Sequence, residues 1–429
     1  RARDRALTAA GIEITLVVPS SWPTHGAEES LQAEPFRIIE LPVRRPGDVN
    51  RHSYADPRAL SEVIRGARPD VLDLHEEPVS QAARQWLAAA GELPVTMYTA
   101  QNVDKRFPPP FAQFETAAYR RVQALYPCSR QAASVARGKG FDGIIDVLPL
   151  GIDNLYSPGE QSAADDETRL GIVGRLVPEK GVSDAIRVLA HVRARRRARL
   201  LVIGSGPEEG TARSLARDLG VADAVEFVAW QPLTGLAELY RSLHVVLVPS
   251  QATETWVEQF GRIILEGQAS GAVVAGYRSG AIPEVAGDSA ILVEEGAVDR
   301  LAVGVEALLD SAERFSHLRQ AALTRTREMT WGAVAERQAD LYERVASLGG
   351  TPGPRVTATA TRRHRARQEF GVPARLLGGY RPFALPLLRR NLAWTRAAGR
   401  ATDTMTTLAQ LARRAVIAQP SDARSPSER

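Results

Sequence analysis

Residues 245–267 read Val-Val-Leu-Val-Pro-Ser-Gln-Ala-Thr-Glu-Thr-Trp-Val-Glu-Gln-Phe-Gly-Arg-Ile-Ile-Leu-Glu-Gly. The apolar run 245–248 is typical of a buried parallel strand, and residues 262–269 predict a helix. Gly261 stands at the start of that helix, where the lack of a side chain lets a ligand approach the backbone. This stretch predicts an anion-binding site, because free backbone amides and the positive end of the helix dipole meet there.

Two glutamates bracket the predicted anion site. Glu258 lies in the loop and Glu266 lies inside the helix. A carboxylate is a natural partner for sugar or ribose hydroxyls, as in dinucleotide-binding folds. The alternative is a solvated helix end with two surface acids, and the spacing of the two glutamates does not by itself separate these interpretations.

A cationic loop precedes this stretch in the chain. Residues 170–174 predict a strand, and Arg175 and Lys180 follow it in a short segment that ends at Gly181. A helix is predicted from about residue 182. Two cations and the free amides of a helix start would neutralise a diphosphate as it leaves. The alternative is a turn with two solvated charges, although Lys180 is one of only three lysines in the chain.

Length, composition and cysteine content limit the class of protein. A chain of 429 residues predicts two domains, and its hydrophobic content of 44% is sufficient for real cores. The single cysteine, Cys128, excludes an intramolecular disulfide and suits a reducing compartment. The sequence has no run of about 18 apolar residues and no signal-peptide pattern, so we expect a cytoplasmic protein without a membrane-spanning helix.

The charge is distributed unevenly along the chain. The net charge is +4, yet residues 351–429 carry 15 arginines against four acidic residues, which leaves a mildly acidic body and a basic tail. Residues 351–365 predict disorder, whereas 374–398 and 406–417 resemble basic amphipathic segments that lie on anionic membranes. Peripheral contact with the inner face of the cell membrane, a flexible tail and a segment packed on the body all stay open. No stacking pattern or motif indicates nucleic acid.

The motifs together resemble the donor site of the retaining glycosyltransferases of family 4, which have the GT-B fold. The resemblance is carried by Glu258-x7-Glu266 with Phe260-Gly261 inside it, by residues 174–181 as a GR(L)xxxKG element, by Gly-Ile-Asp at 151–153 as a GVD turn, and by residues 279–284 as a GG(x)PE loop. Ala281 replaces the second glycine of that last loop. The resemblance covers roughly residues 12–345 and is strongest from 170 to 293.

The resemblance implies an α/β chain with two Rossmann-like domains whose parallel sheets face a cleft, followed by the basic tail. The expected segments are an acceptor-side domain at 1–153, a linker at 154–168, a donor-nucleotide domain at 169–330, a helix crossing back to the first domain at 331–347, and the tail at 348–429. Members of the family begin their first domain one strand and one glycine-containing loop before the strand predicted at 12–19. We therefore expect that unit to be missing from these 429 residues.

The pattern between the motifs predicts the remaining elements. The expected strands are 36–43, 70–74, 95–98, a short apolar strand directly before Pro127, 144–150, 200–203, 225–228, 271–275 and 290–293. The expected helices are 59–66, 114–126, 234–241, 299–309, 312–328 and 331–345. Three consecutive prolines within 105–110 predict a stiff loop.

The resemblance assigns roles to five residues around the phosphates and the sugar. Arg175 and Lys180 would bind the donor diphosphate and stabilise it as it departs. Glu258 would position the transferred sugar together with the backbone of Phe260 and Gly261.

Four further residues complete the expected site. By resemblance, Glu266 would hold the nucleotide ribose, and the turn at Gly204 would approach the nucleotide. Trp230 could stack on the base or serve in packing. His75 follows the strand predicted at 70–74, where open α/β sheets place ligands, and the resemblance puts it beside the donor sugar. The alternative for His75 is a structural histidine.

The expected function is transfer of a sugar, with retention of configuration, from a UDP- or GDP-type donor to a glycan, lipid-linked or small-molecule acceptor, as in polysaccharide biosynthesis. This would be a hexosyltransferase-like enzyme of class EC 2.4. We expect no metal or other cofactor, because protein cations and the helix dipole can replace a metal and no metal-ligand spacing occurs. Three alternatives stay open: a GT-B sugar-nucleotide epimerase, a non-catalytic nucleotide-sugar-binding protein, and a nicotinamide oxidoreductase suggested by the glycines of 204–210.

Overall fold

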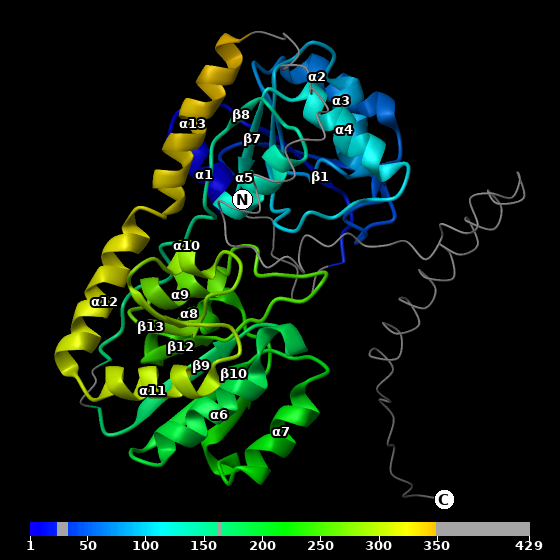
Figure 1. The fold of residues 1–429 in the computed structure, drawn as a ribbon. Helices are drawn as coiled ribbons and strands as arrows, with labels where there is room; N and C mark the ends of the chain where they lie inside the picture. The colour runs from blue at the N-terminus through cyan, green and yellow to red at the C-terminus, as the bar shows by residue number, and fades with distance from the viewer. Residues whose placement is uncertain (24–32, 162–164, 349–429) are drawn as a thin grey trace, which may run out of the picture. The chain divides into compact units, whose positions relative to one another are not determined.

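The computed structural model describes residues 1–23, 33–161 and 165–348, which form two α/β lobes (Figure 1). The predicted α/β class is confirmed. In these three ranges, no helix is both long enough and apolar enough to cross a membrane. The disorder predicted at 351–365 and the amphipathic segments predicted at 374–398 and 406–417 lie outside the described residues.

The C-terminal lobe is built on one sheet of six parallel strands. They are β9 (Thr168–Val173), β10 (Ala198–Ile203), β11 (Val225–Val228), β12 (Val245–Val248), β13 (Val273–Tyr277) and β14 (Ala290–Val293). The strands lie in the order β11-β10-β9-β12-β13-β14, so the direction in which the sheet grows reverses between β9 and β12. Open α/β sheets bind ligands beyond the carboxyl ends of the strands at such a switch point. The loops after β9 and β12 carry the predicted cations and the predicted Glu258.

Helices cover both faces of this sheet, which explains why its strands are continuously apolar. Val245 and Leu247 belong to one buried cluster, with side chains from α6, α7 and α11, whereas Val246 and Val248 belong to a second one, with side chains from α8, α9 and α10. The helices are α6 (Val182–Arg193), α7 (Glu209–Asp218), α8 (Leu233–Ser242), α9 (Arg262–Ala269), α10 (Ile282–Ala286), α11 (Val298–Leu309) and α12 (Ala312–Arg327), with short 3-10 turns at η1 (Pro178–Lys180) and η2 (Ala222–Ala224).

The N-terminal lobe has its parallel strands in two separate sheets. β1 (Thr15–Pro19) pairs with β2 (Arg37–Leu41), and a second sheet has the order β5 (Leu72–Leu74), β6 (Val95–Thr99), β7 (Ala124–Pro127), β8 (Ile144–Ile145). β3 (Val43–Arg44) and β4 (Ser53–Tyr54) form a short antiparallel pair. The helices are α1 (Ala2–Ala9), α2 (Pro57–Ala67), α3 (Gln81–Ala89), α4 (Phe111–Arg121) and α5 (Arg130–Gly138).

A cavity of about 1360 Å³ lies beside β1 and β5 of this lobe. Residues of both strands line it, and so do His75, Tyr98 and, from the C-terminal lobe, Leu233 and Arg262. The two lobes therefore share the wall of one open space. The expected absence of one strand and one glycine-containing loop before residue 12 stays a prediction.

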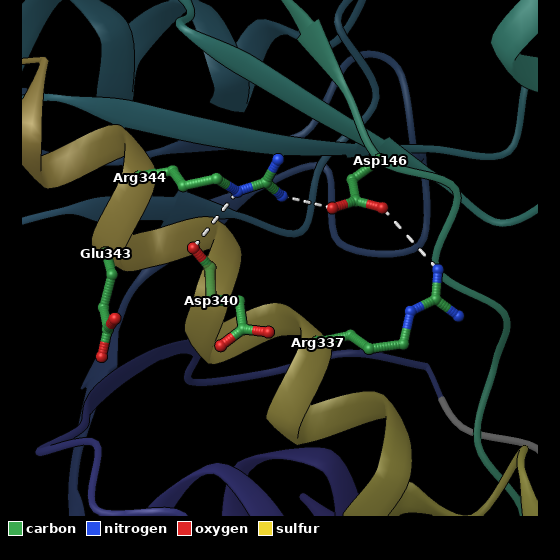
Figure 2. A pocket seen from close by; sticks show the side chains of 5 residues that line it. All are labelled: Asp146, Arg337, Asp340, Glu343 and Arg344. Atoms are coloured by element: carbon green, nitrogen blue, oxygen red, sulfur yellow. Dashed lines mark hydrogen bonds and ion pairs between the residues drawn. The ribbon is translucent and has the colours of Figure 1, made fainter.

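The last described helix, α13 (Trp331–Ser347), packs on the N-terminal lobe. Its Leu341 and Val345 are buried in one cluster with Ala124 and Tyr126 of β7. Asp146, which follows β8, lies between Arg337 and Arg344 of α13 at a charged pocket of about 490 Å³ (Figure 2). None of the residues predicted for the donor site lines this pocket, so it is a salt-bridged junction between helix and lobe.

Two expected elements were wrong. The helix predicted at 114–126 ends at Arg121. Residues 124–127 form β7, which is the short apolar strand expected before Pro127 but begins inside the predicted helix. The reason is tertiary: β7 is buried along its whole length between β6 and β8, and this pairing overrides the helix propensity of the segment. The strand predicted at 144–150 pairs only at Ile144–Ile145. Helices α3, α5 and α7 were not predicted, although the N-cap serines Ser80 and Ser129 marked the first two.

Candidate active site

Loops from the carboxyl ends of β9, β10, β12 and β13 are joined by backbone hydrogen bonds. The Gln251 N–H donates to the Glu179 carbonyl at 2.9 Å, which connects the loops after β12 and β9. The Glu208 N–H donates to Leu176 at 2.9 Å, and the Ala281 N–H donates to Glu258 at 3.0 Å. The sheet thus holds four loops as one rigid rim at its switch point.

Two glycines allow these loops to approach each other. Gly181 has φ +70°, and a Cβ atom there would overlap the Pro249 carbonyl. Gly204 has φ +132°, and its Cβ would overlap the Gly174 carbonyl. Both conformations are strained for residues other than glycine. Gly204 therefore has a structural role in the rim, and its contact with a nucleotide stays a prediction.

The structure brings Lys180 and Glu258 together, although they are 78 positions apart. The Lys180 ammonium lies 2.6 Å from Oε2 of Glu258, and the Ser250 hydroxyl donates to the same oxygen at 3.2 Å. The ammonium also lies 4.9 Å from the centre of the Trp256 ring. Because the Glu258 side chain is buried, this ion pair and hydrogen bond compensate its charge in a partly dehydrated place.

Arg175 lies in the same loop as Lys180 but points to solvent. The residue is exposed, and its guanidinium forms no hydrogen bond or ion pair with any residue that the structure describes. The rim therefore combines one cation that is engaged by Glu258 and one that is free to meet an anion.

The start of α9 adds backbone donors to this rim. Gly261 caps the helix with φ +82°. Within the described part of the chain, the backbone N–H groups of Gly261, Arg262 and Ile263 have no hydrogen-bond acceptor, as expected for the first turn of a helix. Phe260 is buried in one cluster with Ile264, so its side chain is not available to a ligand. The role of its backbone in positioning a sugar stays a prediction.

Glu266 is held inside the lobe by a tyrosine from α8. The Tyr240 hydroxyl donates to Oε2 of Glu266 at 3.0 Å, and the Arg262 guanidinium lies 3.4 Å from Oε1. Burial raises the pKa of Glu266 above its ordinary value, whereas Arg262 and the Tyr240 hydrogen bond oppose that shift. Glu266 is therefore a desolvated carboxylate whose remaining lone pairs could accept hydroxyl donors.

Replacing Glu266 with glutamine is expected to raise the melting temperature by a few degrees near neutral pH. The folded state has the higher Glu266 pKa, so stability falls as the pH rises from the ordinary pKa of a glutamate through the raised one. Glutamine has no charge to desolvate and can still accept the Tyr240 hydrogen bond. Thermal unfolding at neutral and acidic pH tests this, because at acidic pH the gain should vanish. An equal fall in melting temperature at both pH values would contradict the prediction. Glu336→Gln, on the exposed face of α13, is the control.

His75 lies in the other lobe and does not touch Lys180 or Glu258. Its ring stacks on Tyr98 with 4.2 Å between centroids, and its Nδ1 atom lies 3.1 Å from Nη1 of Arg3. The surrounding protein and the Arg3 charge lower the pKa of His75 to about 4. A guanidinium can only donate, so Nδ1 accepts and the proton is on Nε2. His75 thus offers the shared cavity a neutral imidazole N–H.

The remaining predicted residues differ in their surroundings. Trp230 follows β11 and is 55% exposed, which excludes a role in the core and leaves the stacking role as a prediction. Glu284, in the segment similar to a GG(x)PE loop, accepts from the backbone N–H of Arg130 in the other lobe at 2.8 and 3.0 Å.

Sequence reasoning missed three side chains that support the glutamates. Ser250 and Tyr240 donate to the carboxylates of Glu258 and Glu266, and Asn102 donates to the backbone carbonyl of Glu258 at 2.9 Å. Ser250 lies within the quoted stretch and Asn102 lies in a polar turn at a strand end, so the sequence could have marked both as candidate site residues. Their partners could not be predicted, because each contact depends on packing between distant segments.

Among the described residues, no group of three or more His, Cys, Asp or Glu side chains could hold a metal ion. The charged groups of the rim include Arg175, Lys180, Arg262 and the two glutamates, and the expectation that no metal cofactor is needed stays a prediction.

Two family models match the chain, one on each lobe. Residues 157–325 match the family described as glycosyl transferases group 1, and residues 5–154 match the family described as glycosyltransferase family 4.

Curated relatives match about half of the chain. A D-inositol 3-phosphate glycosyltransferase of Segniliparus rotundus is 33% identical over 225 residues, which are 49% of this chain and 49% of the relative. A protein of the same name from Acidothermus cellulolyticus is 34% identical over 241 residues, 48% of this chain and 52% of the relative. The chain thus spans about half the length of the curated relatives that it matches.

Solved structures share the fold. Sucrose-phosphate synthase from Thermosynechococcus elongatus superposes with a TM-score of 0.60 at 18% identity, over 81% of this chain and 92% of that one. Anabaena Alr3699/HepE, in complex with UDP and glucose, superposes with a TM-score of 0.57 at 16% identity, over 72% of this chain and 86% of that one. These likenesses confirm the predicted GT-B arrangement of two Rossmann-like lobes.

Proposed function

Because the chain belongs to the family 4, group 1 glycosyltransferases, we propose that it transfers a sugar from a nucleotide-sugar donor of UDP or GDP type to a carbohydrate, lipid-linked or small-molecule acceptor. The relatives carry the name of glycosyltransferases, and a structural neighbour was solved with UDP and glucose. The observation that carries the proposal is the rim at the switch point. It combines cations, free amides and two buried carboxylates in one place.

In the proposed reaction the bond between the sugar and the diphosphate breaks and a bond to the acceptor oxygen forms, with retention of configuration. The acceptor proton leaves with the diphosphate. Arg175, Lys180 and the amides at the start of α9 stabilise the charge that develops on the leaving phosphate. These groups supply positive charge without a bound metal. Glu258 contacts the hydroxyls of the sugar, and its own position is fixed by Lys180 and Ser250.

The nucleotide half of the donor lies along α9 in this proposal. Glu266 accepts the ribose hydroxyls, while the loops at Gly204 and Trp230 flank the nucleotide. His75 faces the acceptor side of the shared cavity and donates its Nε2–H to an oxygen of the sugar or the acceptor. Since its pKa is about 4, the imidazole acts there as a neutral donor.

We also propose peripheral membrane contact through the basic segment 348–429, which would suit a lipid-linked acceptor. That proposal rests on charge, since residues 351–429 contain 15 arginines and four acidic residues.

The matches to transferase families favour neither the epimerase nor the non-catalytic alternative. Nothing supports the hypothesis of a nicotinamide site at the Gly204 turn.

A thermal-shift panel of UDP, GDP, ADP and their common sugars, with NAD and NADP alongside, tests the proposed donor site. One nucleoside diphosphate at a hundred times its dissociation constant should add about 2.7 kcal/mol to the stability of the wild type. The shift should shrink in Glu266→Gln and persist in Glu336→Gln. A shift with NAD alone, or an equal nucleotide shift in all three proteins, would contradict the proposal.

A further inference from the structure

Asn102 crosses from the N-terminal lobe to the loop that carries Glu258. It follows β6, and its residue is only 5% exposed. Its side-chain amide nitrogen lies 2.9 Å from the Glu258 carbonyl oxygen and 3.5 Å from that of Val257. Both neighbours are carbonyl oxygens, which can only accept hydrogen bonds. The side-chain nitrogen of Asn102, and not its oxygen, must therefore face them.

The same loop is held by two further contacts from the N-terminal lobe. The Gln259 side-chain amide donates to the Ala100 carbonyl at 3.0 Å, and the Cys128 thiol lies 3.7 Å from the Gln259 carbonyl. Asn102 and Ala100 follow β6, and Cys128 follows β7. The carboxyl ends of these two strands therefore form the surface on which residues 257–259 rest.

The Glu258 carbonyl receives one donor from each lobe. Besides Asn102, the backbone N–H of Ala281 donates to it at 3.0 Å. Gly280 passes so close, at φ +54°, that a Cβ atom would overlap this carbonyl oxygen. The Glu258 carbonyl is thus clamped between the lobes. A shift of the backbone at 257–259 away from Asn102 would carry the Glu258 carboxylate away from Lys180.

We propose that Asn102 is a positioning residue for the transfer reaction, acting through Glu258. It makes the geometry of the Lys180–Glu258 pair depend on the docking of the N-terminal lobe. This inference rests on the proposed function, in which Glu258 contacts the donor sugar. Loss of Asn102 should therefore weaken recognition of the sugar much more than recognition of the diphosphate, because the side-chain amide of Asn102 contacts the Glu258 loop and not Arg175, Lys180 or the α9 amides.

Binding of UDP and UDP-glucose, with GDP and GDP-mannose in parallel, to the full chain tests this by calorimetry. Asn102→Ala should weaken the nucleotide sugar about five-fold relative to its diphosphate, the effect of one lost hydrogen bond, and change the diphosphate affinity less than about two-fold. Asn102→Asp should weaken binding of the nucleotide sugar further, since a carboxylate would face two carbonyl oxygens. This affinity should rise again as the pH falls, because a protonated acid can donate a hydrogen bond. Gln113→Ala, an exposed amide on α4, is the control.

A double variant separates positioning from a general structural role. If Asn102 acts through Glu258, adding Asn102→Ala to Glu258→Gln should have little further effect on the ratio of the two affinities. Additive losses, equal losses for sugar and diphosphate, or an Asn102→Ala protein identical to wild type would overturn the inference while leaving the proposed function standing. A wild type that binds neither diphosphate nor nucleotide sugar would overturn both.

Discussion

A Lys180→Ala variant is expected to turn over its nucleotide-sugar donor about 10²- to 10³-fold more slowly than the wild type, the typical loss when one preorganised donor to a developing charge is removed. The ammonium is the partly buried cation of the rim and lies 2.6 Å from Glu258. Without it, the leaving diphosphate loses one of the positive charges that would stabilise it. Among the residues that the structure describes, the substitution also leaves the buried Glu258 carboxylate with the Ser250 hydroxyl as its remaining side-chain donor, which raises the cost of keeping that carboxylate in place.

The measurement is release of the nucleoside diphosphate from whichever donor stabilises the protein. Arg193→Ala removes a cation from an exposed ion pair with Asp223, so it controls for the loss of positive charge alone and should keep wild-type turnover. Lys180→Arg should recover little, because guanidinium and ammonium differ in shape and reach. Turnover of Lys180→Ala within about three-fold of the wild type would exclude Lys180 from the reaction.

The second large effect concerns folding of the rim. Gly181→Ala is expected to lower the free energy of unfolding by roughly 2–4 kcal/mol, the sum of a left-handed conformation for a residue with a Cβ and an overpacked contact. Gly181 has φ +70°, and its Cβ would overlap the Pro249 carbonyl. Because Lys180 is its neighbour, the loop that moves to relieve the overlap carries the cation with it, so donor affinity should fall too.

Gly210→Ala is the matched control for this substitution. Gly210 lies in α7, has no positive φ and has no atom within 4 Å of a built Cβ. At this position the same substitution should raise the free energy of unfolding by about 0.4–1 kcal/mol, because alanine restricts the unfolded chain more than glycine does. Urea unfolding followed by tryptophan fluorescence compares the two variants. Equal midpoints for both would show that the close approach of Gly181 to Pro249 is not required.

Much of the C-terminal lobe could be predicted from its sequence. The predicted limits of β11, β12, α9 and β14 are those that the structure has. Parallel strands covered on both faces are continuous apolar runs, and a helix that starts after a left-handed glycine has a local signal. The N-terminal lobe was less predictable. A short apolar strand was expected before Pro127, but its start was not separated from the preceding helix, because the pairing of β7 with β6 and β8 decides it.

The sequence by itself determined the fold class, the family resemblance and the identity of the charged groups at the strand ends, because periodicity and short motifs are local properties of the chain. Only the tertiary structure decided which groups meet. Lys180 and Glu258 are 78 residues apart, and Asn102 and Glu258 are 156 apart. Such contacts arise from strand order and lobe packing, which bring distant loops to one sheet edge. No local pattern encodes that geometry, so the clamp on Glu258 is a property of the folded chain.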